Sequence, residues 1–406
     1  MIAKLLPVLI STCLLLLSAI GLFLSLWIII PAPTFTLLPL GVGAPEVSPW
    51  LFVLNAIAVL LILFSHHKGW IYSLAIAGSV MGLVLSAYPL SQVAAANQKA
   101  SSAMYQTLGI DYVSKIPVEL QAQLRPQPFV LADVFRGIPT GEVRQQSGIQ
   151  FAQPDGVPLF LEVYQPPLLG TQPGRHPTLV TIYGGAWQTG NPAVNGEFNR
   201  YMAARGYTVI AIDYRHAPKY PFPAQIADVR SALNYIREHA EALEVNLERM
   251  VLMGRSAGAQ LAMLAAYAPN APRLRAVVNY YGPVNLTLGY NQPPDPDPIN
   301  SRAILQAFLG GTPQQKPDLY RAASPYTYAT GKQPPTLLIY GGREHVVQAK
   351  FGRALSDRLK AAGNQTVFIE LPWSEHAFDS IFNGVGNQLA LYYTERFVAW
   401  AMQAGR

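Results

Sequence analysis

Charged residues and cysteine are both scarce in this chain. Asp, Glu, Lys and Arg make up 13% of the 406 residues, whereas hydrophobic residues make up 50%, which departs from the composition of an ordinary soluble protein. The single cysteine, Cys13, cannot form an intrachain disulfide, and it provides no set of thiolates for a metal site. The low charge indicates that part of the chain avoids water.

Several common site motifs are missing as well. The sequence has no H-E-x-x-H, no C-x-x-C pair and no glycine-rich loop that would cradle a phosphate, so neither a metal nor another cofactor is expected. The formal net charge of +6 is modest for this length, and no run of Lys and Arg is interleaved with aromatic residues. Nucleic acid is therefore not expected as a partner.

Long uncharged stretches are present near the N-terminus. Leu5–Ile30 carries no charged residue, and as a helix with a rise of about 1.5 Å per residue it exceeds the roughly 30 Å hydrocarbon core of a bilayer. The run ends in Leu26–Pro31 and not in the small residues of a cleavage site. We therefore expect an uncleaved membrane helix here, not a cleaved signal peptide.

Two further apolar segments, at about 47–65 and 70–88, flank the polar turn His66–Gly69 and predict a helical hairpin. The strictly apolar part of the first segment, Trp50–Phe64, includes Asn55 and is short for a full crossing, so a re-entrant segment is the alternative. Residues 1–90 are thus predicted to form a transmembrane region of about three helices, at about 5–30, 47–65 and 70–88. Aromatic residues that favour membrane interfaces fall at the expected helix ends: Trp27, Trp50, Trp70 and Tyr88.

Basic residues set the expected orientation. Lys4 and Lys68 would lie on one side of a three-helix bundle, whereas the connection Pro31–Pro49 carries Glu46 and no basic residue. Because cytoplasmic loops are enriched in Lys and Arg, the N-terminus is expected in the cytoplasm. Three crossings then place the rest of the chain on the extracytoplasmic side. The sequence predicts a multi-pass integral membrane protein, with the lipid bilayer as one partner.

After a segment of mixed character at 91–140, which we interpret as a linker or lid or as a plain surface connection, strand-like and helix-like segments alternate. This alternation predicts an α/β domain at 141–406, with a mostly parallel sheet covered by helices on both faces. An insertion rich in Pro and Asp at about 285–330 interrupts the alternation and predicts a cap. The expected strands are Ile149–Ala152, Leu159–Tyr164, Thr178–Tyr183, Thr208–Asp213, Met250–Met253, Ala276–Tyr281, Thr336–Tyr340 and Thr366–Leu371.

The pentapeptide Gly254-Arg255-Ser256-Ala257-Gly258 lies between the strand-like run Met250–Met253 and the alanine-rich stretch Gln260–Tyr267. A G-x-S-x-G sequence at a strand–helix junction is typical of a nucleophile elbow, in which a tight turn exposes the serine hydroxyl. The motif is short, and a plain Gly/Ser turn is the alternative interpretation. Ser256 is therefore a candidate nucleophile that needs support from the rest of the chain.

A serine nucleophile requires a base and an acid that orients the base. Of the seven histidines, His345 and His376 follow Ser256 in the sequence, and His376 comes just after the last expected strand. We predict His376 as the base and Glu344, just after the preceding strand, as the orienting acid. The order Ser, acid, His is that of α/β-hydrolases. The alternative for Glu344 is a surface carboxylate paired with Arg343, and the alternative for His376 is a solvated loop histidine.

Backbone N–H groups are expected to stabilise the oxyanion of such a reaction. Ala257 follows the nucleophile, and the turn Tyr183–Trp187 follows an expected strand with small residues that let the backbone approach a substrate oxygen. A Gly-Gly hairpin turn is the alternative for this segment. The predicted oxyanion hole consists of Gly184, Gly185, Ala186 and Ala257.

Four blocks of this sequence resemble the hormone-sensitive-lipase-like carboxylesterases and acetyl esterases of the α/β-hydrolase superfamily: Tyr183–Trp187, Asp213–Ala224, Gly254–Gly258 and His376–Phe378. The resemblance covers about residues 143–402, and the second block, D-Y-R-H-A-P-K-Y-P-F-P-A, is the most specific. The resemblance implies the α/β-hydrolase fold, cleavage of esters, and a structural role for Asp228.

Two residues depart from the family pattern. Tyr183 stands where the family has histidine, which should alter packing more than activity because the oxyanion donors are backbone groups. Glu344 stands where the triad acid is usually aspartate; glutamate serves elsewhere in the superfamily, so the resemblance still implies a triad.

We therefore expect a membrane-anchored serine carboxylesterase or lipase-like hydrolase that uses Ser256, Glu344 and His376 on small or lipid-derived esters. The alternatives are an amidase or peptidase with the same triad, and a non-catalytic membrane scaffold that retains the hydrolase fold.

Overall fold

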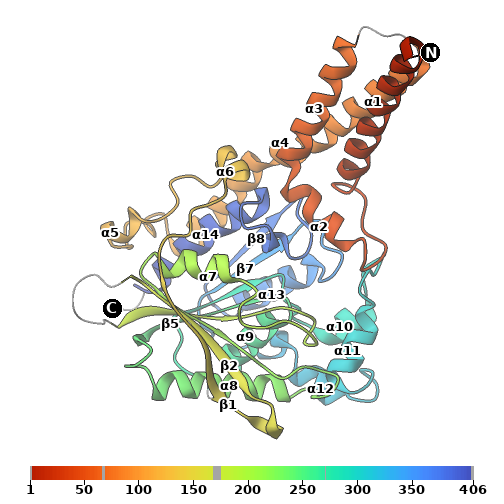
Figure 1. Cartoon of the computed structure of the whole chain (residues 1–406). Helices are drawn as coiled ribbons and strands as arrows, with labels where there is room; N and C mark the ends of the chain where they lie inside the picture. The colour runs from red at the N-terminus through yellow and green to blue at the C-terminus, as the bar shows by residue number, and fades with distance from the viewer. Residues whose placement is uncertain (1, 66–68, 168–174, 270, 404–406) are drawn as a thin grey trace.

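The computed structural model describes residues 2–65, 69–167, 175–269 and 271–403, and in it a helical stalk stands on a globular α/β part (Figure 1). The stalk consists of α1 (Ile2–Leu26), α3 (Ser48–Phe64) and the first half of α4 (Trp70–Leu108). Helix α2 (Leu38–Glu46) lies at its base, against the globular part. Of the predicted polar turn His66–Gly69, residues 66–68 lie outside the described residues.

Small and polar side chains hold the three stalk helices together. Asn55 of α3 donates a hydrogen bond to Ser25 Oγ of α1 at 3.0 Å, and Gly21 and Gly82 leave room for its amide. A Cβ at Gly21 or Gly82 would lie 2.4 or 2.3 Å from Asn55 Oδ1. The polar residue within an apolar helix thus faces the helix bundle, as expected where side chains outside the bundle meet an apolar medium.

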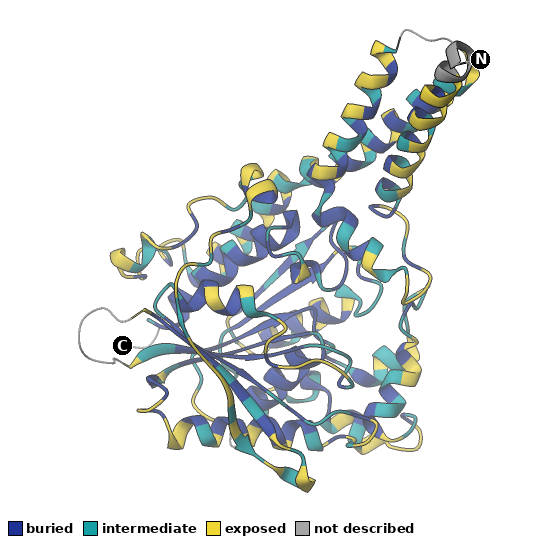
Figure 2. Cartoon of the chain, viewed as in Figure 1, coloured by how far each residue is buried: buried dark blue, intermediate teal, exposed yellow. Residues whose placement is uncertain are grey.

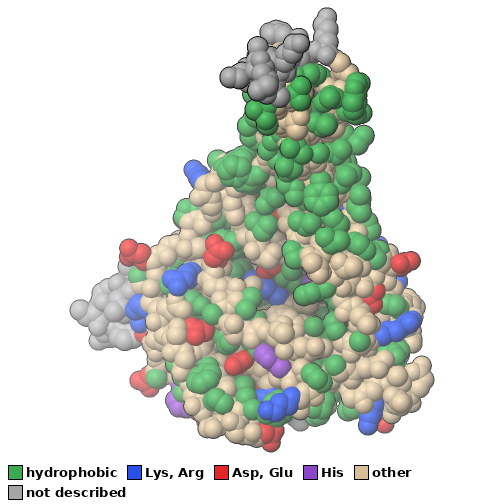
Figure 3. All heavy atoms as spheres, turned by 45° about the vertical axis from the view of Figure 1, so that its right-hand side comes forward, with side chains coloured by type: hydrophobic (Ala, Val, Ile, Leu, Met, Phe, Trp, Pro, Cys, Tyr) green, Lys and Arg blue, Asp and Glu red, His purple; other side chains and the backbone are tan. Residues whose placement is uncertain are grey.

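Two described helices are long and apolar enough to cross a membrane: Val8–Leu26 within α1, and α4. Helices α2 and α3 form a further apolar pair, bent by 81° where they join. The outer sides of the stalk are exposed and hydrophobic, whereas the charged side chains visible in Figure 3 lie on the globular part (Figures 2 and 3).

Helix α4 continues through Pro89 into the globular part, so the third apolar segment and the start of the segment 91–140 are one element. Its second half is fixed by tertiary contacts: Thr107 Oγ1 donates to Thr366 O at 3.2 Å, and the Tyr393 hydroxyl donates to Asn97 O at 2.9 Å. Two short helices follow in the segment 91–140, α5 (Val118–Gln121) and α6 (Leu131–Arg136).

Eight strands of the described residues form one sheet in the order β1-β2-β4-β3-β5-β6-β7-β8. The pairs β1–β2 and β2–β4 are antiparallel, and every other pair is parallel. All eight predicted strands are present, so the prediction of a mostly parallel sheet is confirmed. Their bounds are β1 (Arg144–Ala152), β2 (Leu159–Gln165), β3 (His176–Ile182), β4 (Thr208–Ile212), β5 (Val245–Arg255), β6 (Ala276–Tyr280), β7 (Thr336–Gly341) and β8 (Thr366–Leu371).

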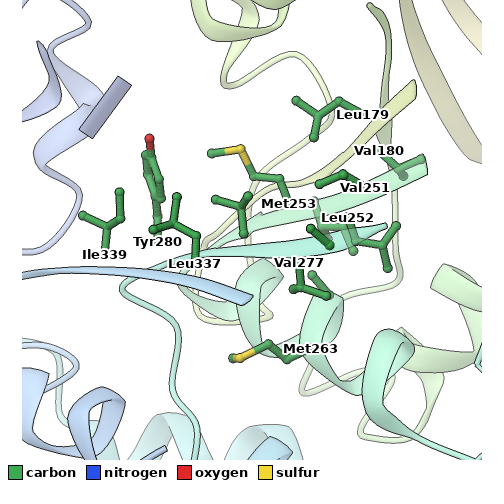
Figure 4. Close-up of a cluster of buried hydrophobic side chains, with 14 of the residues drawn as sticks. Leu179, Val180, Val251, Leu252, Met253, Met263, Val277, Tyr280, Leu337 and Ile339 are labelled. Carbon is green, nitrogen blue, oxygen red and sulfur yellow. The ribbon is translucent and has the colours of Figure 1, made fainter. Parts of the chain in front are cut away.

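Helices cover both faces of this sheet. On one face lie α7 (Gly196–Ala203) and α14 (Val385–Ala401), and on the other lie α8 (Ala224–Glu238) and α9 (Ala257–Tyr267) (Figure 1). Helix α13 (Ala349–Ala361) connects β7 and β8. The apolar side chains of β3, β5, β6 and β7 lie between these layers, and Met263 of α9 packs beneath them (Figure 4). This core holds the carboxyl ends of the central strands side by side, which is where sites form in parallel sheets.

The insertion at 285–330 between β6 and β7 is helical. It contains α10 (Leu286–Asn291), α11 (Ser301–Leu309) and α12 (Pro317–Ala322), followed by the short 3₁₀ helix η2 (Pro325–Tyr328). Phe308 stacks on Trp187 with ring centroids 4.0 Å apart, and Gln260 Nε2 donates to Ala323 O at 2.7 Å. These contacts attach the insertion to the turn after β3 and to α9.

Candidate active site

Ser256 lies at a sharp turn between β5 and α9. Its backbone has φ +50° and ψ −122°, a conformation that non-glycine residues rarely adopt and that persists only where the surroundings enforce it. The two flanking glycines are required by close packing: a Cβ at Gly254 would lie 2.2 Å from Gly258 O, and a Cβ at Gly258 would lie 2.2 Å from Ile182 O. The strand–turn–helix context of a nucleophile elbow is therefore present.

The structure brings together the three residues selected for nucleophilic chemistry. His376 Nε2 lies 2.9 Å from Ser256 Oγ, and His376 Nδ1 lies 2.7 Å from Glu344 Oε1. The three residues follow β5, β7 and β8, and their side chains meet at the carboxyl edge of the parallel sheet. His376 and Glu344 are 8% and 7% exposed, so neither is a solvated surface residue. The three side chains thus form a continuous hydrogen-bonded chain, which is the arrangement that a serine nucleophile with a base and an orienting acid requires.

The Glu344 side chain also contacts the backbone of its own loop. Its Oε1 also accepts hydrogen bonds from Val347 N at 2.8 Å and from Val346 N at 3.3 Å, which fixes the side chain. Burial raises the pKa of the Glu344 carboxyl group, and the neighbouring His376 opposes this shift. The interaction between a buried carboxylate of this kind and the imidazole beside it is strongest when the imidazole becomes positively charged.

A second glutamate–histidine pair lies beside the first. Glu375 Oε2 is 2.5 Å from His345 Nδ1, and Glu375 Oε1 accepts from the backbone N–H groups of His345 and His376 at 2.5 and 3.0 Å. The side-chain hydrogen bond to Glu375 raises the pKa of His345, and burial opposes the shift. Glu375 therefore ties the loop after β7 to the loop after β8.

Sequence analysis weighed His345 as a base but did not predict this pair. The signal was a Glu-His dipeptide after each of two neighbouring strands, Glu344-His345 after β7 and Glu375-His376 after β8. The structure pairs each glutamate with the histidine of the other dipeptide.

The predicted oxyanion-hole residues all line the cavity that contains Ser256. Gly184 lies directly against the nucleophile, since a Cβ there would be 3.1 Å from Ser256 Cβ. Gly185 has φ +129°, and a Cβ at this position would lie 2.1 Å from Thr189 O. Ala186 also has a positive φ, and Ala257 is the first residue of α9, so its N–H has no partner within the helix.

Tyr183, which replaces the usual histidine, supports the turn from behind. Its hydroxyl donates to Asp213 Oδ1 at 2.6 Å and lies 2.9 Å from His216 Nε2, and its ring stacks on Tyr214 at 4.5 Å. The tyrosine thus packs the turn after β3 against the turn after β4. Asp228 accepts from Arg215 N at 2.8 Å and from the Arg215 guanidinium, in keeping with the structural role implied by the resemblance.

Arg255, next to the nucleophile, is 3% exposed and was not predicted as part of the site. Its Nε donates to Asp379, which also accepts from the Tyr281 hydroxyl. The Tyr281 ring packs on the His376 ring with centroids 4.5 Å apart. This buried ion pair therefore supports the serine turn and the histidine ring at the same time.

A cavity of about 1190 Å³ opens beside Ser256 and His376. This volume exceeds the roughly 300–1,000 Å³ of typical small-molecule sites. Two lining residues, Phe35 and Leu38, come from the base of the stalk, and none of the described residues at 91–140 lines the cavity. Much of the remaining wall is apolar and comes from the insertion, from helix α13 and from the loops after β7 and β8, with Leu286, Ile304, Leu305, Val346, Phe351 and Phe382.

No group of three or more His, Cys, Asp or Glu side chains within the described part of the chain is arranged to hold a metal ion.

Comparison with known proteins agrees with this arrangement. A family model described as BD-FAE matches residues 161–359. The chain is 30% identical over 240 residues to the probable carboxylic ester hydrolase LipM of Mycobacterium tuberculosis, a match that covers 56% of this chain and 54% of LipM. It is 32% identical over 254 residues to esterase LipQ of the same organism, which covers 58% of each chain. The chain thus spans little more than half the length of these curated relatives.

Among solved structures, Thermogutta terrifontis esterase 2 phosphonylated by sarin is similar with a TM-score of 0.52. The two chains are 23% identical, and the match covers 64% of this chain and 94% of the esterase. At this identity the likeness concerns the fold alone.

Proposed function

The chain belongs to the hormone-sensitive-lipase-like carboxylesterases of the α/β-hydrolase superfamily, and on this premise we propose that it is a membrane-anchored serine esterase acting on small or lipid-derived esters. The observation that carries the proposal is the position of His376, within hydrogen-bond distance of both Ser256 and Glu344 beside a large, mainly apolar cavity. The esterase names of the relatives LipM and LipQ support the same reaction class.

Acylation begins with a neutral His376. Its Nε2 accepts the proton of Ser256 as Oγ attacks the ester carbonyl carbon, and the carbonyl oxygen becomes negatively charged. Glu344 accepts a hydrogen bond from His376 Nδ1–H and so stabilises the imidazolium. The oxyanion is stabilised by backbone N–H groups, which we assign to Gly184, Gly185, Ala186 and Ala257. When the tetrahedral intermediate collapses, His376 Nε2–H protonates the leaving alcohol, and an acyl ester of Ser256 remains.

Deacylation repeats these steps with water. His376 takes a proton from a water molecule, the resulting hydroxide attacks the acyl carbonyl carbon, and a second oxyanion forms at the same place. The intermediate then releases the carboxylic acid as His376 returns the proton to Ser256 Oγ. No cofactor is needed in either half-reaction.

We further propose that α1, α3 and the first half of α4 cross the membrane. Their length and hydropathy, the exposed apolar surface of the stalk and the polar contacts inside it support this assignment (Figure 3). The segment 91–140 is proposed to act as a linker that fixes the stalk to the catalytic domain, since Arg125 pairs with Asp133 and donates to Gln388 of α14.

The direct test is hydrolysis of p-nitrophenyl esters of increasing acyl length by the full-length protein in detergent. Wild type should turn over these esters, and Ser256→Ala should lower kcat by about 10⁴-fold or more, because the serine and histidine act as one unit. Ser147→Ala, an exposed serine of β1, is the matched control and should retain full activity. Faster turnover of anilides or peptides than of esters would favour an amidase, and a folded wild type that reacts with neither an ester nor a fluorophosphonate probe would favour the scaffold.

A further inference from the structure

The base of the stalk forms part of the cavity that contains the candidate nucleophile. Phe35 and Leu38 lie in and after the connection between α1 and α2, and both line the same cavity as Ser256 and His376. Phe35 is 68% exposed, so a large apolar side chain stands at the cavity without being covered by protein. Val194, another lining residue, is 58% exposed. The cavity therefore has an apolar rim that is open to its surroundings.

This rim lies on the membrane side of the globular part. The C-terminal end of α1, the N-terminal end of α3 and the middle of α4 lie nearest the sheet (Figure 1). Trp27, Trp50 and Tyr88 belong to these parts of the sequence, and aromatic residues of this kind favour the membrane–water interface. Phe35 follows Trp27 by eight residues, which span at most about 28 Å of extended chain. At most this length of chain therefore separates the expected interface from the rim of the cavity.

We propose, on the basis of the function proposed above, that the substrate is a long-chain carboxylic ester that leaves the bilayer along Phe35 and Leu38 and places its acyl chain in the cavity. The size and apolar lining of the cavity suit a long hydrocarbon chain, which a site for acetyl or other small esters would not require. The stalk then serves two purposes, since it anchors the enzyme and also forms one wall of the substrate site.

The test compares p-nitrophenyl palmitate and p-nitrophenyl acetate as substrates of the full-length protein in phosphatidylcholine vesicles. Phe35→Ala and Leu38→Ala should each lower kcat/KM for the palmitate ester about tenfold, because a contact of a large apolar side chain with the acyl chain is lost. Turnover of the acetate ester should stay within twofold of wild type. Phe135→Ala is the control: Phe135 is partly exposed at the stalk base and packs on Trp50, but it does not line the cavity.

Unchanged palmitate turnover in both variants, or equal losses with the two substrates, would overturn the long-chain proposal while leaving an esterase in place. A wild type that hydrolyses neither ester, or a Ser256→Ala variant that retains the activity, would instead refute the proposed function.

A different observation concerns Glu46, the last residue of α2. Its side chain is 0% exposed and reaches into the catalytic domain, where it accepts hydrogen bonds from Ser374 Oγ at 2.7 Å, Gly386 N at 2.6 Å and Asn387 N at 3.4 Å. Two glycines at the start of α14 make the space. A Cβ at Gly384 or at Gly386 would come within 2.6 Å of a Glu46 carboxyl oxygen.

Ser374, which donates a hydrogen bond to Glu46, contacts both loops that carry the proposed triad. Ser374 comes two residues before His376, and its carbonyl oxygen accepts from Arg343 N at 3.0 Å, next to Glu344. Ser374 therefore connects the foot of the stalk to two loops, the loop that carries His376 and the loop that carries Glu344. Movement of Ser374 would change the distance between His376 and its two partners.

The structure assigns to Glu46 the role of a positioning residue, which acts on His376 through Ser374. In the full-length protein, Glu46→Gln should lower kcat for p-nitrophenyl acetate about tenfold and leave KM within twofold, because His376 shifts while the substrate cavity is unchanged. Ser374→Ala should lower kcat in the same way. Since both variants break one connection, the double variant should be no slower than Glu46→Gln alone.

The matched control is Glu395→Gln, a buried carboxyl group of α14 that accepts from Arg125 N at 2.6 Å and from the Tyr201 hydroxyl at 2.9 Å. It should lower the thermal midpoint without changing kcat. A Glu46→Gln variant that loses only thermal stability, or kcat losses that multiply in the double variant, would contradict the positioning role. If Glu46→Gln does not fold, Ser374→Ala alone decides, because unchanged kcat in that variant excludes the connection.

Discussion

At the scale of single residues, the site consists of two Glu–His pairs that cross between adjacent loops. One pair, Glu344 with His376, contacts Ser256, and the other, Glu375 with His345, joins the loops to each other. The second pair contributes to the first by holding the backbone of His376. The two histidines therefore have different surroundings: His376 contacts the proposed nucleophile Ser256, whereas His345 contacts Glu375 of the neighbouring loop.

We predict that His345 makes the stability of the folded protein depend on pH. Because the hydrogen bond to Glu375 raises the pKa of His345, the folded state favours the protonated imidazole. The stabilisation is complete below the ordinary value of 6.5 and is lost as the pH rises through the raised pKa. Replacing His345 by Gln should lower the thermal midpoint by about 2 °C in mild acid and by less at alkaline pH.

The measurement is thermal unfolding of wild type and His345→Gln from acid to alkaline pH. His239→Gln is the control, because His239 lies exposed directly after helix α8 and stacks on Tyr235 at 3.9 Å. A difference between wild type and His345→Gln that does not change with pH would exclude the proposed linkage.

At the scale of elements, the position of Ser256 depends on how closely α9 approaches β3. Gly258 lies in the first turn of α9, and its Cα faces the carbonyl oxygens of Ile182 and Tyr183 at the end of β3. A Cβ there would lie 2.2 and 2.3 Å from these oxygens. The helix and the strand can keep this distance only with glycine at the contact.

We therefore expect Gly258→Ala to move α9 away from β3 and to displace both Ser256 and the N–H of Ala257. A displacement of about 1 Å lowers kcat on the order of 100-fold, and the overpacked contact costs about 1–3 kcal/mol of stability. Ester hydrolysis and thermal unfolding measure the two effects. Gly331→Ala is the control, since a Cβ at Gly331 meets no heavy atom within 4 Å. Full activity of Gly258→Ala would show that the elbow tolerates a wider spacing.

At the scale of the whole molecule, the stalk and the catalytic domain are joined at one end only. The C-terminal end of α1, the N-terminal end of α3 and the middle of α4 all lie near the sheet, together with α2 and the connection that contains Phe35 (Figure 1). If the three helices span a bilayer, this connection and the catalytic domain share one side. The polar turn between α3 and α4 then lies on the other side, with the N-terminus.

Reporter fusions test this topology. Alkaline phosphatase fused after Arg406 should be active, because the catalytic domain is expected outside the cytoplasm, and green fluorescent protein fused after Lys68 should fluoresce, because that turn is expected in the cytoplasm. Exchanging the two reporters gives the matched controls, which should both be silent. Alkaline phosphatase activity at Lys68 and not at Arg406 would reverse the orientation.

Local sequence patterns were sufficient for the strands and for the candidate site. The strands are short apolar runs bounded by turn residues, and Ser256, Glu344 and His376 each come within five residues of the end of a strand, so their common edge of the sheet could be predicted. The apolar stretches of the stalk were equally clear, because hydropathy depends on composition and length alone.

Contacts between distant segments were decided only by the tertiary structure. Glu46 and Ser374 are 328 residues apart in sequence, and nothing near Glu46 indicates that its carboxyl group binds the loop of His376. In the same way, α4 continues through Pro89 because β8 and α14 hold its second half, and Phe35 lines the cavity because α2 turns back onto the domain. The sequence by itself determined which segments are strands, apolar helices and reactive turns, since these depend on neighbouring residues. Which side chains meet, and with which partners, depended on packing across the whole chain.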